Sequence, residues 1–562
     1  MSTAPRVRIL DELDAIIHAE GRISDRVHWA SKVEEPVASR WPDKNLWGGA
    51  CQVSRGPSTP AVLATARGEQ AAGKRVAVVA DARSLLGARD EIEALVKGGV
   101  GIVVHALGRL GEAGREALAL SDLGVGVLLS AGPEDAHDLT LLARRAAEDS
   151  GTPIVVVHEV SGERSLETVH VASDEGIADY VGSPALRAKP PAESARSLAS
   201  VARLKHEDRI PFALGSAMRD LEPHTGRRHD VVERVARDDA EIVLFGAGAS
   251  GDAALAVAEQ LRDAGASVAG VRLTALRPYP GPRVVKALSR ALAVCVLEFV
   301  HEPLAQSGPL ATELKASFAD AMTWATGYPG VGRLPRIVSC ATEEGEIEAA
   351  HVALALATIL EQGERVVRTL AFVPGAVAAA HPRATTRVTT RIMVPSASVG
   401  QACAPLVCEV VARATGLRVA ASPRSVGDDA VLDVVVATER PRAGIAPLTL
   451  DAVVAHSPTL LERTAPLTGL AVGAHVHVVG TGPLPPSSAL LCDDRGAKVA
   501  RGALPPATGE EATRLFAAAA SGVVCAAAAR IARAPIDPAE VARVAAEILG
   551  AAAGPVARAA MG

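Results

Sequence analysis

The sequence predicts an α/β protein with three domains, each built on a parallel sheet. Short apolar runs of strand length alternate with stretches whose apolar residues recur at helical spacing. Glycines stand where several of these runs give way to helices. The chain has 562 residues, more than a single hydrophobic core usually organises. Aromatic residues make up only 2%, so we expect cores of valine, leucine, alanine and isoleucine.

The first domain is expected to cover residues 1–223. Its apolar runs predict four strands and its amphipathic stretches predict two helices. Asp135 and Asp138 fall early on the second helix, where carboxylates complement the helix dipole. The expected strands are Arg75–Ala80, Gly101–His105, Val125–Ser130 and Pro153–His158, and the expected helices are Ala88–Lys97 and Glu134–Ala147.

The second domain is expected to cover residues 224–362. An apolar run, Ile242–Phe245, leads through glycines into a helical stretch that ends at Gly265, and a β-branched run follows. This order predicts a βαβ unit and therefore parallel strands. Glu298 interrupts a further apolar strand, so we expect its carboxylate to face a helix N-terminus or an arginine.

The glycine-rich turn of this unit has two interpretations. Gly246, Gly248 and Gly251 match G-x-G-x-x-G between a strand and a helix, where backbone amides cradle a phosphate. The other interpretation is close packing of the strand against the helix. A dinucleotide site also needs an acidic residue at the end of the next strand, and Val271–Ala275 has none. The missing carboxylate argues against dinucleotide binding, and a nucleotide-binding module is kept as a separate hypothesis for the function of this chain.

The third domain is expected to cover residues 363–562. A strand, Thr389–Val394, precedes a helix, Gln401–Thr415, and a second strand follows at Val431–Ala437. The tail, Ala517–Ala560, is rich in alanine and reads as packed helices with a break near residues 535–538.

Composition narrows the classes of function. The net charge of −6 with mixed signs favours neither a nucleic-acid partner nor an anionic membrane surface. We find no apolar run of membrane-spanning length and no secretory signal, so we expect a cytoplasmic protein. The seven cysteines form no C-x-x-C pair, which argues against an iron–sulfur cluster in this chain and favours small core residues.

The second domain resembles domain II of the pyruvate:ferredoxin oxidoreductase family, the 2-oxoacid:acceptor oxidoreductases, which is similar to the transketolase C-terminal domain. The resemblance is carried by V-R-L-x-x-L-R-P-Y-P at Val271–Pro280, by Glu298, and by E-P-L-A-Q-S-G-P-L at Glu302–Leu310. The lead-in His224–Arg228 also resembles the T-G-R motif of the family.

The resemblance extends to both flanking domains. Lys44–Gly48 and Asp122–Ala147 resemble domain I, which covers the pyrimidine half of thiamine diphosphate. Asp451–Glu462 and Leu470–Val479 resemble the gamma domain of the family. The implied order is a pyrimidine-binding-like domain I, a transketolase C-terminal-like domain II and a gamma-like domain, equivalent to an alpha subunit fused to a gamma domain.

Several family site positions are changed in this sequence. Arg109 aligns with the arginine that binds the substrate carboxylate, and it is our candidate catalytic residue. By spacing, Arg26 falls at the position of a substrate-contacting threonine. Thr59 falls at that of the glutamate that bonds the cofactor's pyrimidine nitrogen, although Pro60 follows it at the expected helix start. Ser396–Ser398 replace glycines of the gamma-domain loop, which is implicated in coenzyme A handling.

The resemblance implies a subunit of a 2-oxoacid:ferredoxin oxidoreductase, which oxidatively decarboxylates pyruvate or another 2-oxoacid to an acyl-CoA. We assign no cofactor and no metal to this chain alone. A TPP-binding beta subunit and a ferredoxin-type iron–sulfur subunit or domain would carry thiamine diphosphate, Mg²⁺ and [4Fe–4S] clusters in a hetero-oligomer, with coenzyme A as substrate. The alternative is a catalytically decayed structural or regulatory subunit. The sequence identifies neither the 2-oxoacid nor the partner.

Overall fold

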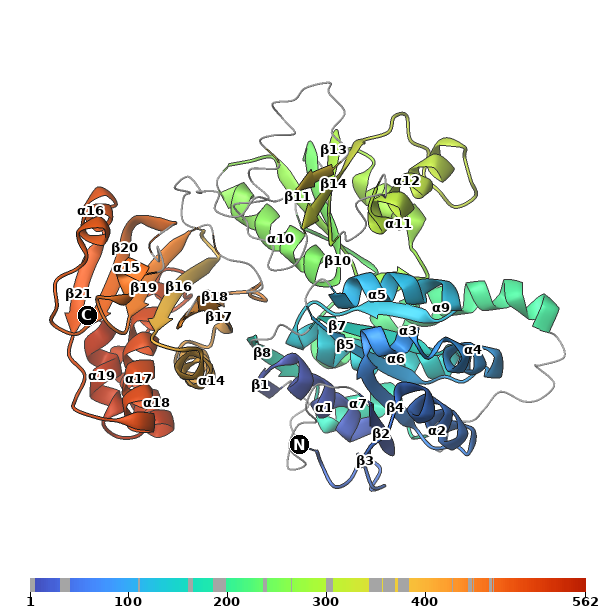
Figure 1. Cartoon of the computed structure of the whole chain (residues 1–562), viewed down its shortest axis with the longest axis horizontal. Helices are drawn as coiled ribbons and strands as arrows, with labels where there is room; N and C mark the ends of the chain where they lie inside the picture. The colour runs from blue at the N-terminus through green and yellow to red at the C-terminus, as the bar shows by residue number, and fades with distance from the viewer. Residues whose placement is uncertain are drawn as a thin grey trace.

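Three sheets form the centres of three lobes in the computed structural model (Figure 1). The fold class, α/β with mainly parallel strands, is as predicted. The structure describes residues 6–30, 41–109, 112–159, 165–184, 199–235, 240–263, 265–299, 307–342, 356, 369–371, 384–426, 428–442, 447, 449–463, 467 and 469–561. Part of the family motif at Glu302–Leu310, residues 302–306, lies outside this set.

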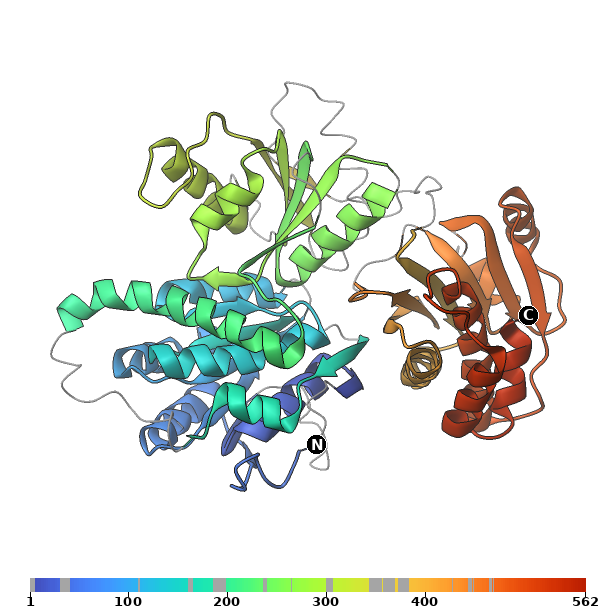
Figure 2. The ribbon, with the colours of Figure 1, turned by 180° about the vertical axis from the view of Figure 1, so that it is seen from behind.

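The first sheet has the order β12-β6-β7-β5-β4-β2-β3, and all its pairs are parallel except β12 with β6. Helix α6 packs against α1 and α9 beside it, and Figure 2 shows α9 running along this lobe. Its strands are β2 (Arg26–Ala30), β3 (Gln52–Arg55), β4 (Val76–Asp81), β5 (Val103–Gly108), β6 (Gly126–Leu129), β7 (Ile154–Glu159) and β12 (Ala275–Arg277). Its helices are α1 (Glu12–Ile23), α2 (Thr59–Ala71), α3 (Ala82–Leu86), α4 (Arg89–Gly98), α5 (Glu112–Leu120), η2 (Ser121–Leu123), α6 (Pro133–Ser150), α7 (Asp174–Val181) and α9 (Ala199–Thr225).

The second sheet has the order β15-β14-β13-β10-β11-β9, with β9 antiparallel to β11. The predicted βαβ unit is present as β10, α10 and β11. It could be predicted because the spacing of apolar residues that marks each strand and helix is read within a few neighbouring residues. Its elements are β9 (Val232–Val235), β10 (Ile242–Ala247), α10 (Gly248–Asp263), β11 (Val268–Leu273), α11 (Gly281–Leu288), β13 (Ala293–Phe299), α12 (Pro309–Met322), β14 (Arg336–Thr342) and β15 (Thr369–Ala371).

The third sheet is mixed, with the order β1-β8-β17-β18-β16-β19-β20-β21. Helices α14, α17, α18 and α19 pack together beside it. Its strands are β1 (Arg6–Leu10), β8 (Leu166–Val171), β16 (Arg387–Val394), β17 (Arg418–Val426), β18 (Asp429–Ala437), β19 (Leu450–Ala455), β20 (Leu470–Val479) and β21 (Lys498–Gly502). Its helices are α14 (Ala397–Thr415), α15 (Leu460–Arg463), α16 (Pro486–Asp494), α17 (Gly509–Ala528), α18 (Pro538–Leu549) and α19 (Ala553–Met561).

Strands from one sequence segment pair in the sheet of another. The antiparallel pair β1–β8, from the first 171 residues, extends the third sheet by pairing β8 with β17. Strand β12, which follows β11 of the second sheet, instead pairs with β6 of the first. Sheet membership therefore crosses the boundaries predicted at 223 and 362.

One described helix, α17, is long and apolar enough to cross a membrane by length and composition. Most of its apolar window, 72%, is buried inside the protein, where it packs against α14 and α19. This burial is that of a core helix. All seven cysteines are free and buried, as their apolar surroundings in the sequence predict.

The chain itself fills the space that the glycine motif creates. A Cβ atom on Gly246 would lie 2.6 Å from the Ser250 carbonyl, and one on Gly251 would lie 2.8 Å from the Gly246 oxygen. Gly248, with φ of +57°, lies against Leu129 and Ser130 of the first lobe. The glycines thus serve strand–helix packing and an interdomain contact, which favours the packing interpretation.

We predict opposite effects of alanine at two glycines. Gly246→Ala forces backbone apart between β10 and α10, so we expect a loss of unfolding free energy on the order of 2–3 kcal/mol. Gly68, on an exposed part of helix α2, has open space at its Cβ position, so Gly68→Ala should stabilise by about 0.5–1 kcal/mol. Thermal unfolding compares the two. A Gly246→Ala variant as stable as wild type would contradict the packing role.

Candidate functional site

The carboxyl edge of the first sheet holds two of the predicted site positions. Arg109 follows β5 directly and is exposed. Thr59 begins helix α2 and is buried, and its hydroxyl lies 2.7 Å from that of Ser84 in α3. Pro60 occupies the first turn of this helix, where a missing N–H costs nothing.

Arg26 lies at the opposite edge of the same sheet. It is the first residue of β2, which ends at Ala30. Its guanidinium Nε lies 3.8 Å from the Glu69 carboxylate on α2. Arg26 is therefore not grouped with Thr59 and Arg109. Spacing in the sequence could not show this, because it does not say where a strand begins.

A set of acidic side chains gathers at the carboxyl ends of β6 and β7. Glu12, at the start of α1, lies 3.4 Å from the Ser130 hydroxyl. Burial, together with the charges of Glu159 and Glu167, raises the pKa of Glu12 well above its usual value. Glu159 accepts a hydrogen bond from the Gly114 amide at 3.2 Å. No local pattern in the sequence indicates this grouping, since its members come from three separate elements.

The first turn of α6 is the point where all three lobes meet. Asp135 pairs with Arg272 of β11 at 2.5 Å and with Arg440, which follows β18, at 3.0 Å. Its side chain is only 4% exposed. Despite burial, these two guanidiniums hold the pKa of Asp135 well below its usual value. The sequence placed Asp135 correctly in the first turn of a helix but missed both partners.

Neighbouring carboxylates extend this junction. Glu134 of α6 pairs with Arg418 of β17 at 2.5 Å. Glu167 of β8 lies 3.5 Å from Arg440. Burial outweighs the attraction of that arginine and, with the nearby carboxylates, raises the pKa of Glu167 to about 7. We use the name three-lobe junction for Glu134, Asp135, Glu167, Arg272, Arg418 and Arg440.

A second set of ion pairs joins α10 to the third lobe beside a cavity of about 270 Å³. Arg442 pairs with Asp252 and, at 2.7 Å, with Glu233. Arg387 lies 3.3 Å from Glu259, which also contacts Arg442. Three of the arginines lining this cavity, Arg387, Arg440 and Arg442, thus have carboxylate partners within the chain, so their charges mainly join the lobes.

The T-G-R motif, residues 225–227, joins the end of helix α9 to helix α6. Arg227 grips Asp138 of α6 through two nitrogens, at 2.6 and 2.7 Å, and donates to the His170 carbonyl. His229 adds a third contact to Asp138 at 2.8 Å. The motif therefore fixes the end of helix α9 to α6, and Asp138, like Asp135, does more than complement a helix dipole.

Glu298 has the helix partner that the sequence predicts. One oxygen accepts from the backbone amide of Leu310, in the first turn of α12, at 3.0 Å. The other accepts from the Ser339 hydroxyl at 2.7 Å. Gly308 is needed here, because a Cβ atom would come within 2.1 Å of this carboxylate. The glutamate and this glycine of the family motif form one helix cap.

Two serines lie at the start of α14 in the third lobe, Ser396 as its N-cap and Ser398 in its first turn. Ser396 caps this helix by accepting from the Val399 amide at 3.4 Å, and it lies 3.0 Å from the Ser398 hydroxyl. These serines thus form an ordinary helix cap.

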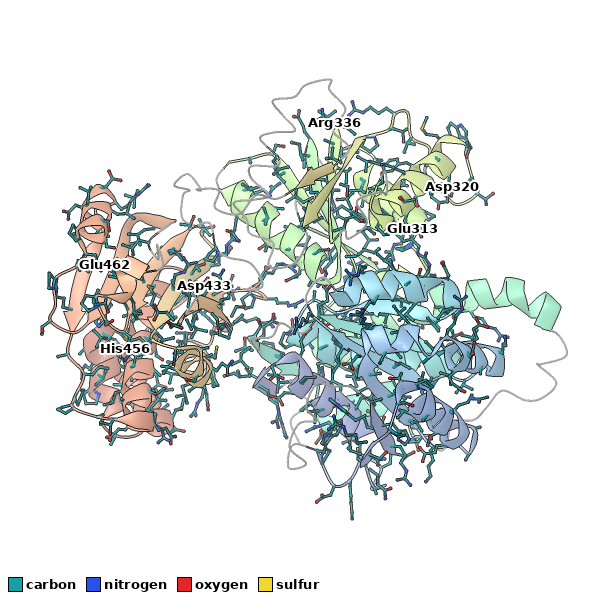
Figure 3. The ribbon with its side chains drawn as sticks, in the orientation of Figure 1. Glu313, Asp320, Arg336, Asp433, His456 and Glu462 are labelled. Atoms are coloured by element: carbon teal, nitrogen blue, oxygen red, sulfur yellow. The ribbon has the colours of Figure 1, made fainter. Side chains whose placement is uncertain are left out.

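His456, labelled in Figure 3, follows β19, and its ring centroid lies 4.9 Å from that of Phe516.

The described residues give a poor fit to the pyrimidine half of thiamine diphosphate. Where the resemblance expects a carboxylate, the buried Thr59 hydroxyl is already bonded to Ser84. A hydroxyl cannot share a proton with a ring nitrogen as a carboxylate does. We derive no chemical step through this cofactor. Within the described ranges no group of three or more His, Cys, Asp or Glu side chains is placed to hold a metal.

Comparison with known proteins matches these features to a family. Residues 240–333, which include β10 to α12, match the family model for pyruvate:ferredoxin oxidoreductase core domain II. The chain therefore contains a segment that is similar to core domain II of the 2-oxoacid oxidoreductase family. The recognition made from Val271–Pro280 and Glu298 is thereby confirmed. The matched segment contains the glycine turn, Arg272 and the Glu298 cap.

Two relatives carry the name pyruvate synthase subunit PorA. The one from Thermotoga maritima is 24% identical over 203 residues, covering 33% of this chain and 50% of the relative. The one from Methanothermobacter thermautotrophicus is 25% identical over 222 residues, covering 37% of this chain and 57% of the relative. The chain thus spans about half the length of these curated relatives.

A solved structure is also similar. It is the 2-oxoglutarate:ferredoxin oxidoreductase from Magnetococcus marinus with 2-oxoglutarate, coenzyme A and succinyl-CoA bound. The identity is 15%, the TM-score is 0.45, and the match covers 63% of this chain and 65% of the other.

We predict that Asp135→Asn destabilises the protein by about 3–5 kcal/mol, because it leaves Arg272 and Arg440 buried without their shared charge. Denaturant unfolding measures the change. Asp149→Asn, on the exposed last turn of the same helix, removes the surface pair with Arg145 and should cost less than about 1 kcal/mol. Equal losses in the two variants would show that the junction does not hold the lobes.

Glu167→Gln should instead stabilise the protein at pH 8. Because folding raises the Glu167 pKa, the folded state binds this proton more tightly, and the group lowers stability as pH rises from 4.5 to about 7. The gap corresponds to at most about 3 kcal/mol. Unfolding at pH 5 and pH 8 should show the gain from Glu167→Gln only at the higher pH. A loss at pH 8 would mean that attraction to Arg440 dominates.

Proposed function

We propose that this chain is a subunit of a 2-oxoacid:ferredoxin oxidoreductase complex that converts pyruvate or another 2-oxoacid to an acyl-CoA. The observation that carries the proposal is the match of residues 240–333 to core domain II, together with relatives named pyruvate synthase subunit PorA. We propose that a TPP-binding beta subunit and a ferredoxin-type iron–sulfur subunit or domain complete a hetero-oligomer. Thiamine diphosphate, Mg²⁺ and [4Fe–4S] would belong to those partners, and the compartment would be cytoplasmic.

The contribution of this chain to catalysis would come from Arg109. It stands exposed at the carboxyl end of β5, where a parallel sheet commonly presents its site. A guanidinium there suits the carboxylate of a 2-oxoacid by geometry and charge. Thr59 supports the alternative, a catalytically decayed subunit that braces the partner's site, because its hydroxyl is used internally by Ser84.

The first test recovers the tagged chain from its native cells, identifies the bound chains and assays 2-oxoacid-dependent reduction of a viologen dye with coenzyme A. We expect partner chains that carry thiamine diphosphate and iron–sulfur clusters. In the complex, Arg109→Ala should raise KM for the 2-oxoacid about 10–100-fold, the loss of one charged hydrogen-bonding partner. Arg543→Ala, at an exposed site on α18, is the matched control.

Three outcomes separate the hypotheses. A KM for the 2-oxoacid that rises in Arg109→Ala but not in Arg543→Ala supports a catalytic subunit. An active complex that is insensitive to Arg109→Ala but loses activity without this chain supports the structural subunit. Recovery of no such partner chain would overturn both and leave the family match as a record of ancestry.

A further inference from the structure

An exposed serine of the first lobe is hydrogen-bonded to a buried histidine, which is in turn bonded to a glutamate. Ser54 lies on the edge strand β3 and is exposed, whereas His28 on the neighbouring strand β2 is 7% exposed. The two residues are register partners in a parallel pair, so their side chains project from the same face. The distance from Ser54 Oγ to His28 Nδ1 is 2.7 Å.

Glu69 fixes the state of the imidazole. Its Oε2 lies 2.7 Å from His28 Nε2, on the opposite side of the ring from Ser54. A carboxylate only accepts, so Nε2 of the neutral ring carries the hydrogen and Nδ1 presents its lone pair. The Ser54 hydroxyl must then donate to His28. Arg26, on the strand of His28, lies 3.8 Å from Glu69 and is a charged group beside this chain of bonds.

Helix α2 covers the inner strands of this sheet but not its edge strand, so the serine end of the hydrogen-bonded set is exposed to solvent. Helix α2 carries Glu69 and packs against β2 and β4. It therefore buries His28, while the edge strand β3 stays accessible at Ser54. A nucleophile, a base that takes its proton and a carboxylate that orients the base are the elements of an activated serine.

We propose that Ser54 is a nucleophilic acylation site that accepts an acyl group from an activated acyl donor, such as an ester or thioester. The Ser54 oxygen attacks the donor carbonyl, and its proton passes to His28 Nδ1. The bond from the carbonyl carbon to the donor's leaving group then breaks. The leaving group departs with the bonding electrons and takes the proton back from His28. The products are an O-acyl serine and the free alcohol or thiol. His28 is the base and Glu69 is a positioning residue.

The test uses the full chain and p-nitrophenyl acetate. Release of p-nitrophenolate gives the rate, and peptide mass mapping locates the acetyl group. We expect acetylation at Ser54, abolished in Ser54→Ala and slowed at least tenfold in His28→Ala. Ser487, an exposed serine of α16, is the matched control and should stay unmodified. Circular dichroism checks that each variant is folded.

Glu69→Gln keeps the shape of the side chain and is partly exposed, so it provides a variant that should fold even if His28→Ala does not. Removing the carboxylate charge disfavours the protonated ring, so the pH midpoint of Ser54 acetylation should move to lower pH. A merely structural hydrogen bond would leave this midpoint in place. The proposal is overturned if Ser54 reacts no faster than Ser487, or at an unchanged rate in folded His28→Ala. This test does not depend on the proposed complex, and either can fail alone.

Discussion

The arrangement of the lobes depends on the need to neutralise the carboxylates of one helix turn. Glu134 and Asp135 are buried where α6 begins, and an isolated buried charge costs several kcal/mol. Their arginine partners come from the second lobe at Arg272 and from the third at Arg418 and Arg440. Glu134 also lies 3.4 Å from Arg227 of its own lobe, whereas both arginine partners of Asp135 come from the other lobes, so assembly of the three lobes is part of folding the first.

Local structure followed from the sequence, and pairing between distant segments did not. The β10–α10–β11 unit is predictable because strand and helix periods are read within a few residues. The pairing of β8 with β17 joins segments about 250 residues apart and has no such signal. The glycine motif was ambiguous for a physical reason. A missing Cβ at Gly246 allows close approach equally to a phosphate or to the protein's own backbone, and only the structure shows which is there.

The candidate site shows the same difference between local features, which the sequence predicts, and long-range contacts, which it does not. Thr59 was placed by counting along the sequence and Arg109 by its alignment after a strand, and both lie at the carboxyl edge of the sheet. Arg26 was placed by the same count and lies at the other edge, because counting along a loop does not fix where β2 starts. Asp135 was read as a dipole partner, since its two arginines follow 137 and 305 residues later. Such long-range ion pairs leave no local pattern.

Strand β8 has a mechanical consequence. It is continuous with the first lobe in sequence, yet its backbone is hydrogen-bonded to β17, and the Thr168 side chain adds bonds to the Val419 backbone at 2.9 and 3.1 Å. A hinge between the first and third lobes would have to break this ladder. A load applied to the third lobe would instead travel along β8 as tension, past Glu167, to the start of α6. Because β8 is continuous with the first lobe and hydrogen-bonded to the third, we expect the two lobes to move as one rigid body.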